Sequence, residues 1–298
     1  MTKAALRIAT RKSELAQWQA NEVGRTLGEP YELLPVETHG DIDVSSPLSE
    51  IGGQGVFVKE VQMALLRKEA DIAVHSAKDL PAATHQDLII AAFLPRGDVR
   101  DAMVGSPLMA LANGATVATG SARRKAILLW HRPDLNVVAL RGNIRTRLAR
   151  VGEADAVVIA YAALLRLGLA TMAAEVLDPE VFCPQVAQGA IAIETRADDS
   201  RAIEAASHLD DALTRAHVSA ERSMLKTLGS GCTLPVGAYS TSLESGNGLF
   251  GMIASLDGKE VVSASMSGSD ALRLGAEMGA YLLSAGGERL LASATSRS

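Results

Sequence analysis

The amino-acid sequence predicts an α/β protein with two lobes, each built on a mixed, mostly parallel sheet, followed by a small α+β domain with a three-stranded antiparallel sheet. The order of the elements supports this prediction. Strand-like runs alternate with helical patterns in two series up to residue 160, and from about residue 216 the order becomes helix, three strands and helix. A chain of 298 residues that is 48% hydrophobic is long and apolar enough for two or three domains.

The first series of elements lies between residues 6 and 94. Ser13 can begin a helix that extends to about Leu27, because its hydroxyl can accept a hydrogen bond from a free backbone N–H group. A second helix, over residues 56–68, is indicated by apolar side chains at helical spacing. Strands are predicted over residues 6–10, 31–38, 70–75 and 88–94.

A second series begins near Asp101 and is followed by the C-terminal domain. Its strands are predicted over residues 115–119, 136–140 and 156–160, with helices over 123–130 and 144–151. In the C-terminal domain we expect helices over residues 216–228 and 270–283, and strands over 236–241, 249–256 and 260–266. Two α/β series predict two lobes with a cleft between them, and ligands of such sheets lie beyond the carboxyl ends of the strands.

Basic residues are concentrated in one part of this acidic chain. Residues 123–150 contain eight lysines and arginines and a single acid, Asp134, whereas the whole chain carries a formal net charge of −5. Clustered guanidinium groups repel one another unless an anion compensates them, and arginine binds planar carboxylates or phosphates through two parallel hydrogen bonds. A solvated basic surface is the alternative interpretation.

The position of these cations favours an anion site, because they recur where a predicted strand ends and a helix begins. A helix start presents free N–H groups and the positive end of the helix dipole. Residues 145 and 147 are too close to share a helix face, so we expect one of them to point into the cleft. Ordinary helix caps and surface arginines are the alternative. The junction residues are Arg11, Lys78, Asp79, Thr119, Ser121, Arg123, Arg124, Arg141, Gly142, Arg147 and Arg166.

Two further side chains are candidates for chemistry. Asp79 follows an apolar strand in the segment HSAKDLP, where Pro81 ends regular structure. Its carboxylate can stabilise positive charge or transfer a proton. The alternative is a structural turn in which Asp79 pairs with Lys78. Cys232 lies in the loop GSGCTLPVG, where it is either a nucleophile or covalent anchor or an inert, half-buried thiol. His75 is more typical of a core residue than of a base.

Composition excludes several other classes of protein. Aromatic residues make up 3% of the chain and the pI is about 5.7, which argues against a nucleic-acid partner. The N-terminal residues lack the apolar stretch of a signal peptide, and no apolar run is long enough to cross a membrane. Two cysteines and six histidines without ligand spacing predict neither a disulfide framework nor a metal site. We therefore expect a soluble, cytoplasmic protein with no membrane partner.

Seven segments, in order along the chain, resemble the hydroxymethylbilane synthase family, also called the porphobilinogen deaminases. The resemblance covers nearly the whole chain, and several of the segments are long and specific to the family. The segments are RIATRKSELAQWQA (7–20), GGQGVFVKEVQMALL (52–66), DIAVHSAKDLP (71–81), TGSARRKAILL (119–129), LRGNIRTRL (140–148), PQVAQGAIAIETR (184–196) and GCTLPVG (231–237).

The resemblance implies an activity and a cofactor. Such enzymes are transferases of tetrapyrrole biosynthesis that condense four porphobilinogens head to tail into hydroxymethylbilane with loss of ammonia. They work on a covalent dipyrromethane cofactor, one per chain, joined by a thioether to a cysteine that Cys232 matches. Asp79 would be catalytic. The cofactor would be bound by Cys232, Lys78, Ser76, Thr119, Ser121, Arg123, Arg124, Arg141 and Gly142, and the substrate by Arg11, Ser13, Arg147, Arg166 and Gln188.

The resemblance also implies a domain organisation. The lobes would be like periplasmic binding proteins, with residues 1–95 and 188–207 in the first lobe, 96–187 in the second and 208–298 in the cofactor-anchoring domain; we expect a monomer. The chain departs from the family where glycine is common at the positions of Ala187 and Ala192, and Cys183 matches no family position. The alternatives are a two-lobed protein that binds a carboxylate-rich ligand without turnover and a nucleic-acid binder that uses the arginines on phosphates.

Overall fold

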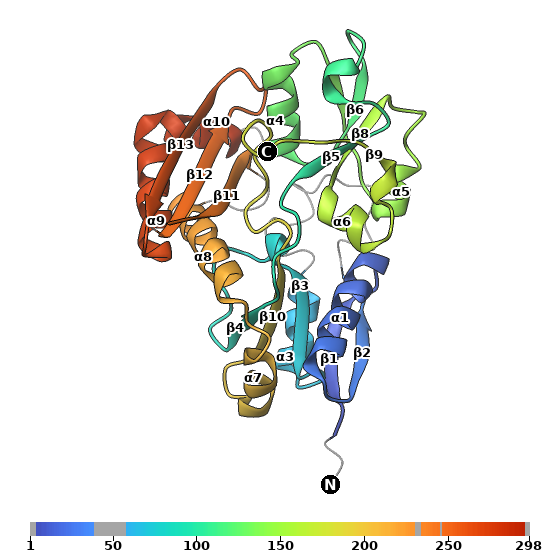
Figure 1. The fold of residues 1–298 in the computed structure, drawn as a ribbon, viewed down its shortest axis with the longest axis vertical. Coiled ribbons are helices and arrows are strands. Elements are labelled where there is room, and N and C mark those ends of the chain that lie inside the picture. Colours follow the sequence, from blue (N-terminus) through green and yellow to red (C-terminus); the bar gives the residue numbers. More distant parts are fainter. Residues whose placement is uncertain (1–3, 39–57, 230–233, 245, 296–298) are drawn as a thin grey trace.

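The computed structural model describes residues 4–38, 58–229, 234–244 and 246–295, and this part of the chain forms two lobes and a third domain beside them (Figure 1). The first lobe has a five-stranded sheet in the order β2-β1-β3-β10-β4, in which only β10 runs against the others. Its strands are β1 (Leu6–Arg11), β2 (Tyr31–Val36), β3 (Ile72–Ser76), β4 (Leu88–Phe93) and β10 (Ile191–Arg196). Its helices are α1 (Glu14–Leu27), α3 (Lys59–Leu66), the 3-10 turn η1 (Ala77–Asp79) and α7 (Ser200–Ser207).

The second lobe repeats this plan with a sheet in the order β7-β6-β8-β5-β9, in which only β5 runs against the others. The strands are β5 (Asp101–Val104), β6 (Thr116–Ala118), β7 (Asn136–Val138), β8 (Ala156–Ala160) and β9 (Ala173–Val176). The helices are α4 (Ala122–His131), α5 (Ile144–Leu148) and α6 (Tyr161–Arg166), with 3-10 turns η2 (Leu108–Ala110) and η3 (Ala170–Met172).

The third domain contains the antiparallel sheet β11-β12-β13 and helices on one side of it. Helices α8 and α9 pack closely because Gly275 has no side chain: a Cβ there would lie 2.1 Å from the carbonyl oxygen of Ala220. The elements are α8 (Ala212–Thr227), β11 (Val236–Leu243), β12 (Gly246–Ala254), β13 (Val261–Gly268), α9 (Ala271–Leu282), η4 (Leu283–Gly287) and α10 (Glu288–Thr295).

The third domain packs against both lobes. One apolar cluster joins Leu80 and Phe93 of the first lobe to Met224 of α8. A second cluster joins Leu128 of α4, in the second lobe, to Met252 of β12. Burying a side chain of this size contributes about 1.5–3 kcal/mol relative to leaving it exposed, so these clusters hold the three parts together.

The fold class is confirmed, and most predicted helices and strands are observed within a few residues of their expected bounds. Helix α8 begins at Ala212 rather than near residue 216, because Asp211 caps it by accepting a hydrogen bond from the Thr214 backbone (2.7 Å). Helix α3 begins at Lys59 among the described residues, and the expected start near residue 56 lies outside them.

The pattern did not predict β5, β9 and β10 as strands. Strand β10 was missed because its second half is polar although all six residues are buried. Glu194 pairs with His75 (3.1 Å) and Arg196 donates to the carbonyl oxygen of Leu65 (2.8 Å), so tertiary partners satisfy these groups. Strand β10 follows the second lobe in sequence but pairs in the sheet of the first lobe. The residue limits of the three domains stay a prediction.

Candidate active site

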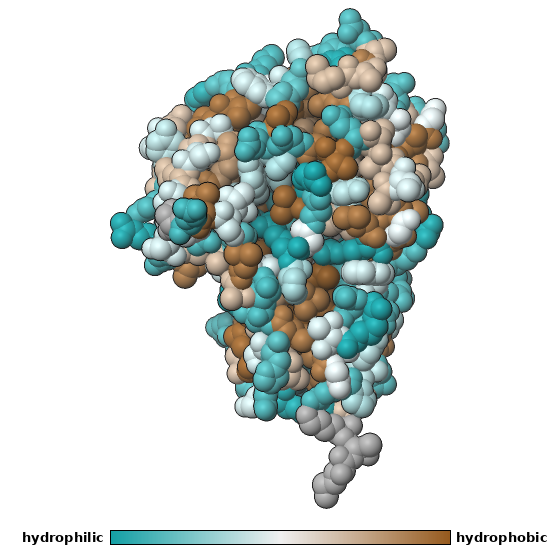
Figure 2. All heavy atoms as spheres, in the orientation of Figure 1, coloured by the Kyte–Doolittle hydropathy of each residue, from teal (hydrophilic) through white to brown (hydrophobic). Residues whose placement is uncertain are grey.

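The carboxyl ends of β1, β3, β6 and β8 lie at the boundary between the lobes, where helices α1 and α6 face each other (Figure 1). A small cavity at this boundary is lined by Ser76 and Lys78 of the first lobe and by Ala160 and Arg166 of the second. On the face shown in Figure 2, hydrophilic residues form a band across the middle of the molecule, where the lobes meet. The structure thus brings the junction residues of both lobes to one boundary.

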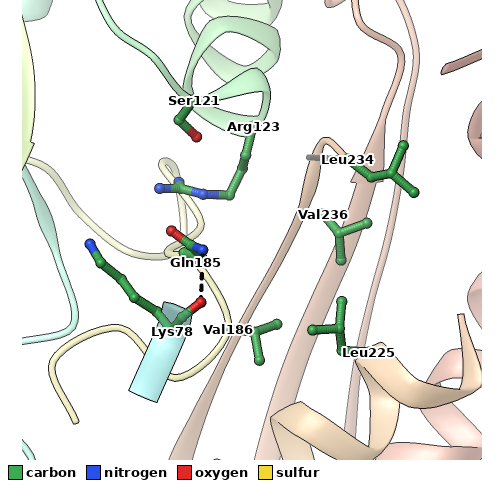
Figure 3. Close-up of a pocket in the computed structure, with 8 residues that line it drawn as sticks. All are labelled: Lys78, Ser121, Arg123, Gln185, Val186, Leu225, Leu234 and Val236. Atoms are coloured by element: carbon green, nitrogen blue, oxygen red, sulfur yellow. Dashed lines mark hydrogen bonds between the residues drawn. The ribbon is translucent and has the colours of Figure 1, made fainter. Parts of the chain in front are cut away.

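A second cavity lies where both lobes meet the third domain (Figure 3). One wall is polar and the other is apolar. The polar wall is formed by Lys78, Ser121, Arg123 and Gln185, and the apolar wall by Val186, Leu225, Leu234 and Val236. Cys232 lies outside the described residues, but Leu234 is only two residues after it, so the loop that carries the thiol ends at this cavity.

Both arginines at the start of α4 are buried around one acid, Asp101 of β5. Arg123 Nη2 lies 2.7 Å from Asp101 Oδ2, and Arg124 Nη2 lies 2.7 Å from Asp101 Oδ1. Burial opposes ionisation of Asp101, but the two guanidinium charges outweigh it and hold the pKa of this carboxyl well below its usual range. Asp101 was not among the predicted site residues, because its only local signal in the sequence is an acid at the start of an apolar strand.

One atom of this cluster has no partner. The Nε of Arg123 is buried and makes no hydrogen bond with the described residues, although its Nη atoms bind Asp101 and the carbonyl oxygen of Cys183. A buried donor left without an acceptor costs about 1–3 kcal/mol. Arg123 also lines the cavity, and a carboxylate that reached Nε would supply the missing acceptor. This donor set therefore fits an anionic group.

Lys78 is joined to the same cluster through Gln188. Its Nζ lies 3.3 Å from Gln188 Oε1, and Gln188 Nε2 donates to Asp101 Oδ1 (2.9 Å) and to the carbonyl oxygen of Val99 (2.8 Å). Desolvation by the surrounding protein, followed by repulsion from Arg124, lowers the pKa of Lys78 to about 8. Gln188 is fully buried, and its hydrogen bonds to Lys78 of the first lobe and Asp101 of the second link the two lobes.

Four arginines and Asp79 interact electrostatically at the lobe boundary. Desolvation, followed by the charge of Arg124, lowers the pKa of Arg147 to about 10; Arg141 and Arg11 act in the same direction, and Asp79 acts in the opposite one. No described residue forms a hydrogen bond or ion pair with the Asp79 carboxylate. The half-buried Asp79 thus lies among several cations, which is an arrangement suited to an anionic ligand that develops positive charge.

Gly142 gives Arg147 its orientation. Arg147 Nε donates to the Gly142 carbonyl oxygen (2.8 Å), and Gly142 has a φ of +104°. A Cβ at this position would lie 2.8 Å from Thr146 Cγ2, so both the backbone angle and the space require glycine.

The remaining predicted residues occupy defined places near the lobe boundary. Arg166 donates to the Gly189 carbonyl oxygen (2.6 Å) and its guanidinium lies 5.9 Å from the centre of the Trp18 ring; burial lowers its pKa to about 10. Ser76 exchanges hydrogen bonds with Gln19 (3.0 and 3.1 Å). Thr119 Oγ1 accepts from the Ser121 backbone (3.3 Å).

Two hydroxyls cap helices, as the alternative interpretation expected. Ser13 accepts from the Ala16 backbone and Ser121 from the Arg124 backbone, each at 3.4 Å. A capping hydroxyl that accepts one bond still has its own O–H to donate, so capping is compatible with ligand binding.

Several other basic residues of the 123–150 cluster are paired at the surface. Arg145 is exposed and forms two hydrogen bonds with Glu14 (2.6 and 2.7 Å), whereas Arg147 lies among the boundary charges. Arg132 pairs with Asp134 (2.8 Å) and Arg150 with Glu153 (3.0 Å). Acids of the chain itself therefore compensate much of the excess charge.

The described residues contain no group of three or more His, Cys, Asp or Glu side chains placed to hold a metal ion. They also contain no helix that is long and apolar enough to cross a membrane.

Comparison with known proteins identifies the family. Residues 6–204 match the family model of the porphobilinogen deaminase, dipyromethane cofactor binding domain, and residues 216–284 match that of the porphobilinogen deaminase, C-terminal domain. The porphobilinogen deaminase of Trichlorobacter lovleyi is 42% identical over 98% of this chain and 97% of its own length. That of Syntrophotalea carbinolica is 41% identical over 98% and 96%.

A structural match to a solved protein is weaker. An ancestral cationic amino acid solute binding protein covers 69% of this chain and 87% of its own, with a TM-score of 0.41 and 13% identity. The family assignment depends instead on the two family models and on relatives above 40% identity over nearly the whole chain. On these grounds the chain belongs to the porphobilinogen deaminase family.

Proposed function

We propose that this chain condenses four porphobilinogen molecules head to tail into hydroxymethylbilane, with release of ammonia at each condensation, on a dipyrromethane primer attached to Cys232. The observation that carries the proposal is the buried Nε of Arg123, which has no acceptor among the described residues, on a side chain that lines a cavity with Lys78, Ser121 and Leu234. A cavity lined by cations, with a buried donor that lacks an acceptor, suits a polyanion, and Leu234 on its wall is two residues after Cys232 in the sequence.

The polar residues at the lobe boundary would bind carboxylates. Each pyrrole of primer and substrate carries one acetate and one propionate, so every added unit brings two negative charges. We assign the cofactor to Lys78, Ser76, Thr119, Ser121, Arg123, Arg124, Arg141 and Gly142. We assign the incoming substrate to Arg11, Ser13, Arg147, Arg166 and Gln188. When bound, the dipyrromethane supplies the nucleophilic pyrrole carbon to which the units are added.

Asp79 would act on the reacting substrate. When the C–N bond of the aminomethyl group breaks and ammonia leaves, positive charge develops on the substrate pyrrole, and a nearby carboxylate stabilises it. The same carboxylate can accept the proton that is released when the new C–C bond forms. Cations at neighbouring positions would hold the substrate carboxylates away from it.

The apolar wall would exclude water from the bound rings. Leu225, Leu234 and Val236 line the cavity opposite the cations. Electrostatic interactions strengthen where water is excluded, so this wall increases the effect of the charged residues.

The mass of the intact protein under denaturing conditions tests the proposal, with wild type measured beside Cys232→Ser. We expect the wild type to carry an excess of two deaminated pyrrole units that the variant lacks. Incubation with porphobilinogen should then give a ladder of heavier wild-type species and free product. A wild type that binds porphobilinogen but neither carries the excess nor turns over would contradict the proposal and support a binding protein instead.

We also propose that the chain works as a monomer in the cytoplasm, without a nucleic-acid partner. Each residue assigned above comes from one chain, so the site needs no second copy. Light scattering after gel filtration would measure the mass in solution, and a mass of two chains or more would contradict the monomer.

A further inference from the structure

The turn η1, which carries Lys78 and Asp79, is held by the segment of residues 185–190. The Ala77 backbone N–H donates to the Ala190 carbonyl oxygen (3.0 Å), Gln185 Nε2 donates to the Lys78 carbonyl oxygen (3.2 Å), and Lys78 Nζ donates to Gln188 Oε1 (3.3 Å). Asp79 is the last residue of this turn, and its carboxylate has no hydrogen bond with a described residue. The position of its carboxylate therefore depends on these three contacts.

The same segment is attached to the other parts of the molecule. Gln188 donates to Asp101 in the second lobe (2.9 Å), and the Gly97 backbone donates to the Gly189 carbonyl oxygen (3.1 Å). The Ala187 backbone donates to Glu221 of α8 in the third domain (2.7 Å). Because both lobes and the third domain meet in residues 185–190, this segment sets where η1 stands relative to the cations of the second lobe.

Gln185 provides the side-chain contact to η1 from a residue that is not assigned to the cofactor or the substrate. The contact of Ala77 is made by the backbone, and Lys78 and Gln188 belong to the proposed site. Figure 3 shows the Gln185 amide between the Arg123 guanidinium and the Lys78 main chain, with its nitrogen directed at the Lys78 carbonyl oxygen. Its side chain is half-buried on the wall of the cavity.

We propose that Gln185 is a positioning residue, which fixes the Lys78–Asp79 turn against the segment between the lobes and thereby places the Asp79 carboxylate for reaction. The inference rests on the proposed function. Gln185 adds no charge to the site, so it affects the geometry of the reacting group and leaves the attachment of the cofactor unchanged. Loss of one neutral hydrogen bond of this kind should lower the rate by about three- to tenfold.

Gln185→Met tests this inference, because methionine has nearly the length of glutamine but no amide donor. We expect the intact mass to show full cofactor attachment, kcat to fall by about three- to tenfold, and KM for porphobilinogen to change little. Amide hydrogen exchange in a peptide covering residues 77–80 should become faster, a readout that does not depend on turnover. Gln185→Ala, which lacks the same donor, should show the same loss of kcat.

The matched control is Asn136→Ala, which removes an amide hydrogen bond of similar length (Asn136 Nδ2 to Thr116 Oγ1, 3.3 Å) at the exposed start of β7. It should change neither kcat nor exchange of the turn. A cofactor-loaded Gln185→Met with wild-type kcat and wild-type exchange would overturn the inference and leave the proposed function standing. A loss of kcat in Gln185→Ala alone would also overturn it, because the side chain would then only fill space. A wild type without cofactor or turnover would overturn both proposals.

Discussion

Ala187 holds a strained backbone conformation between the lobes, and replacing it with glycine should separate strain from packing. Its φ is +60°, in the left-handed region where a Cβ costs about 1–2 kcal/mol. The matched position is Ala192 in β10, which belongs to the same apolar cluster and has no positive φ. Ala187 and Ala192 are 1% and 0% exposed, so glycine removes an equally buried methyl group at each.

The expected change in the free energy of unfolding has two contributions that both sites share and a third, the backbone strain, that only Ala187 has. At both sites, glycine loses a buried methyl group, worth about 0.8 kcal/mol, and gains freedom in the unfolded chain, worth about 0.5–1 kcal/mol. Ala192→Gly should therefore lower the free energy of unfolding by about 1.5 kcal/mol. Ala187→Gly also releases the strain, so its free energy of unfolding should stay close to that of the wild type.

Urea unfolding of the wild type and both variants measures this difference through the transition midpoints. The contrast between the variants is the informative quantity, because the shared terms cancel in it. If both variants are destabilised equally, the left-handed conformation at Ala187 carries no strain and the reasoning fails.

The remaining predictions concern single charges. Asp79→Asn should keep its attached cofactor but lose turnover by roughly a hundredfold or more, because its shape remains and its charge does not; near-normal porphobilinogen consumption would remove Asp79 from the mechanism. Arg147→Leu should change the mass ladder of enzyme-bound intermediates, and an unchanged ladder would contradict its carboxylate-binding role. Glu14→Gln should leave the urea midpoint unchanged, since its pair with Arg145 is exposed and screened; a clear shift would show that the pair holds the lobes. The last prediction concerns Lys78 and is tested in the Cys232→Ser background. Because its pKa is lowered from 10.5 to about 8 in the folded protein, the unfolded chain binds more protons than the folded one between these pH values, and the free energy of unfolding should rise with pH over this range. Adding Lys78→Met should remove that part of the rise.

Local pattern was sufficient to predict the strand ends that make the site. Arg11, Lys78, Asp79 and Arg141 each follow an apolar run closely, and the α/β order brings the carboxyl ends of such strands to one boundary. The charges of Asp79 and Arg141 both affect the pKa of Arg147, which agrees with the expectation that these residues lie close together. The roles given to these residues stay predictions, because proximity alone does not show what they bind.

Local pattern could not predict the buried acids. Asp101 meets Arg123 and Arg124 only through the pairing of β5 with β8 and the packing of α4, which no short window contains. Glu221 lies in the middle of α8 and would be read as a solvated helix residue. It is fully buried, where it binds Arg96 through two hydrogen bonds (2.6 and 3.0 Å).

Asp101 changes how the arginine excess of residues 123–150 should be understood. A charge count treats every guanidinium as equally available to a ligand. Asp101 instead compensates Arg123 and Arg124 and holds them in place, while Arg123 Nε has no acceptor among the described residues. Within the described residues Arg147 has no such buried acid, and desolvation together with neighbouring arginines lowers its pKa to about 10. The arginines of the cluster therefore differ in how available they are to a ligand, because Asp101 already balances Arg123 and Arg124.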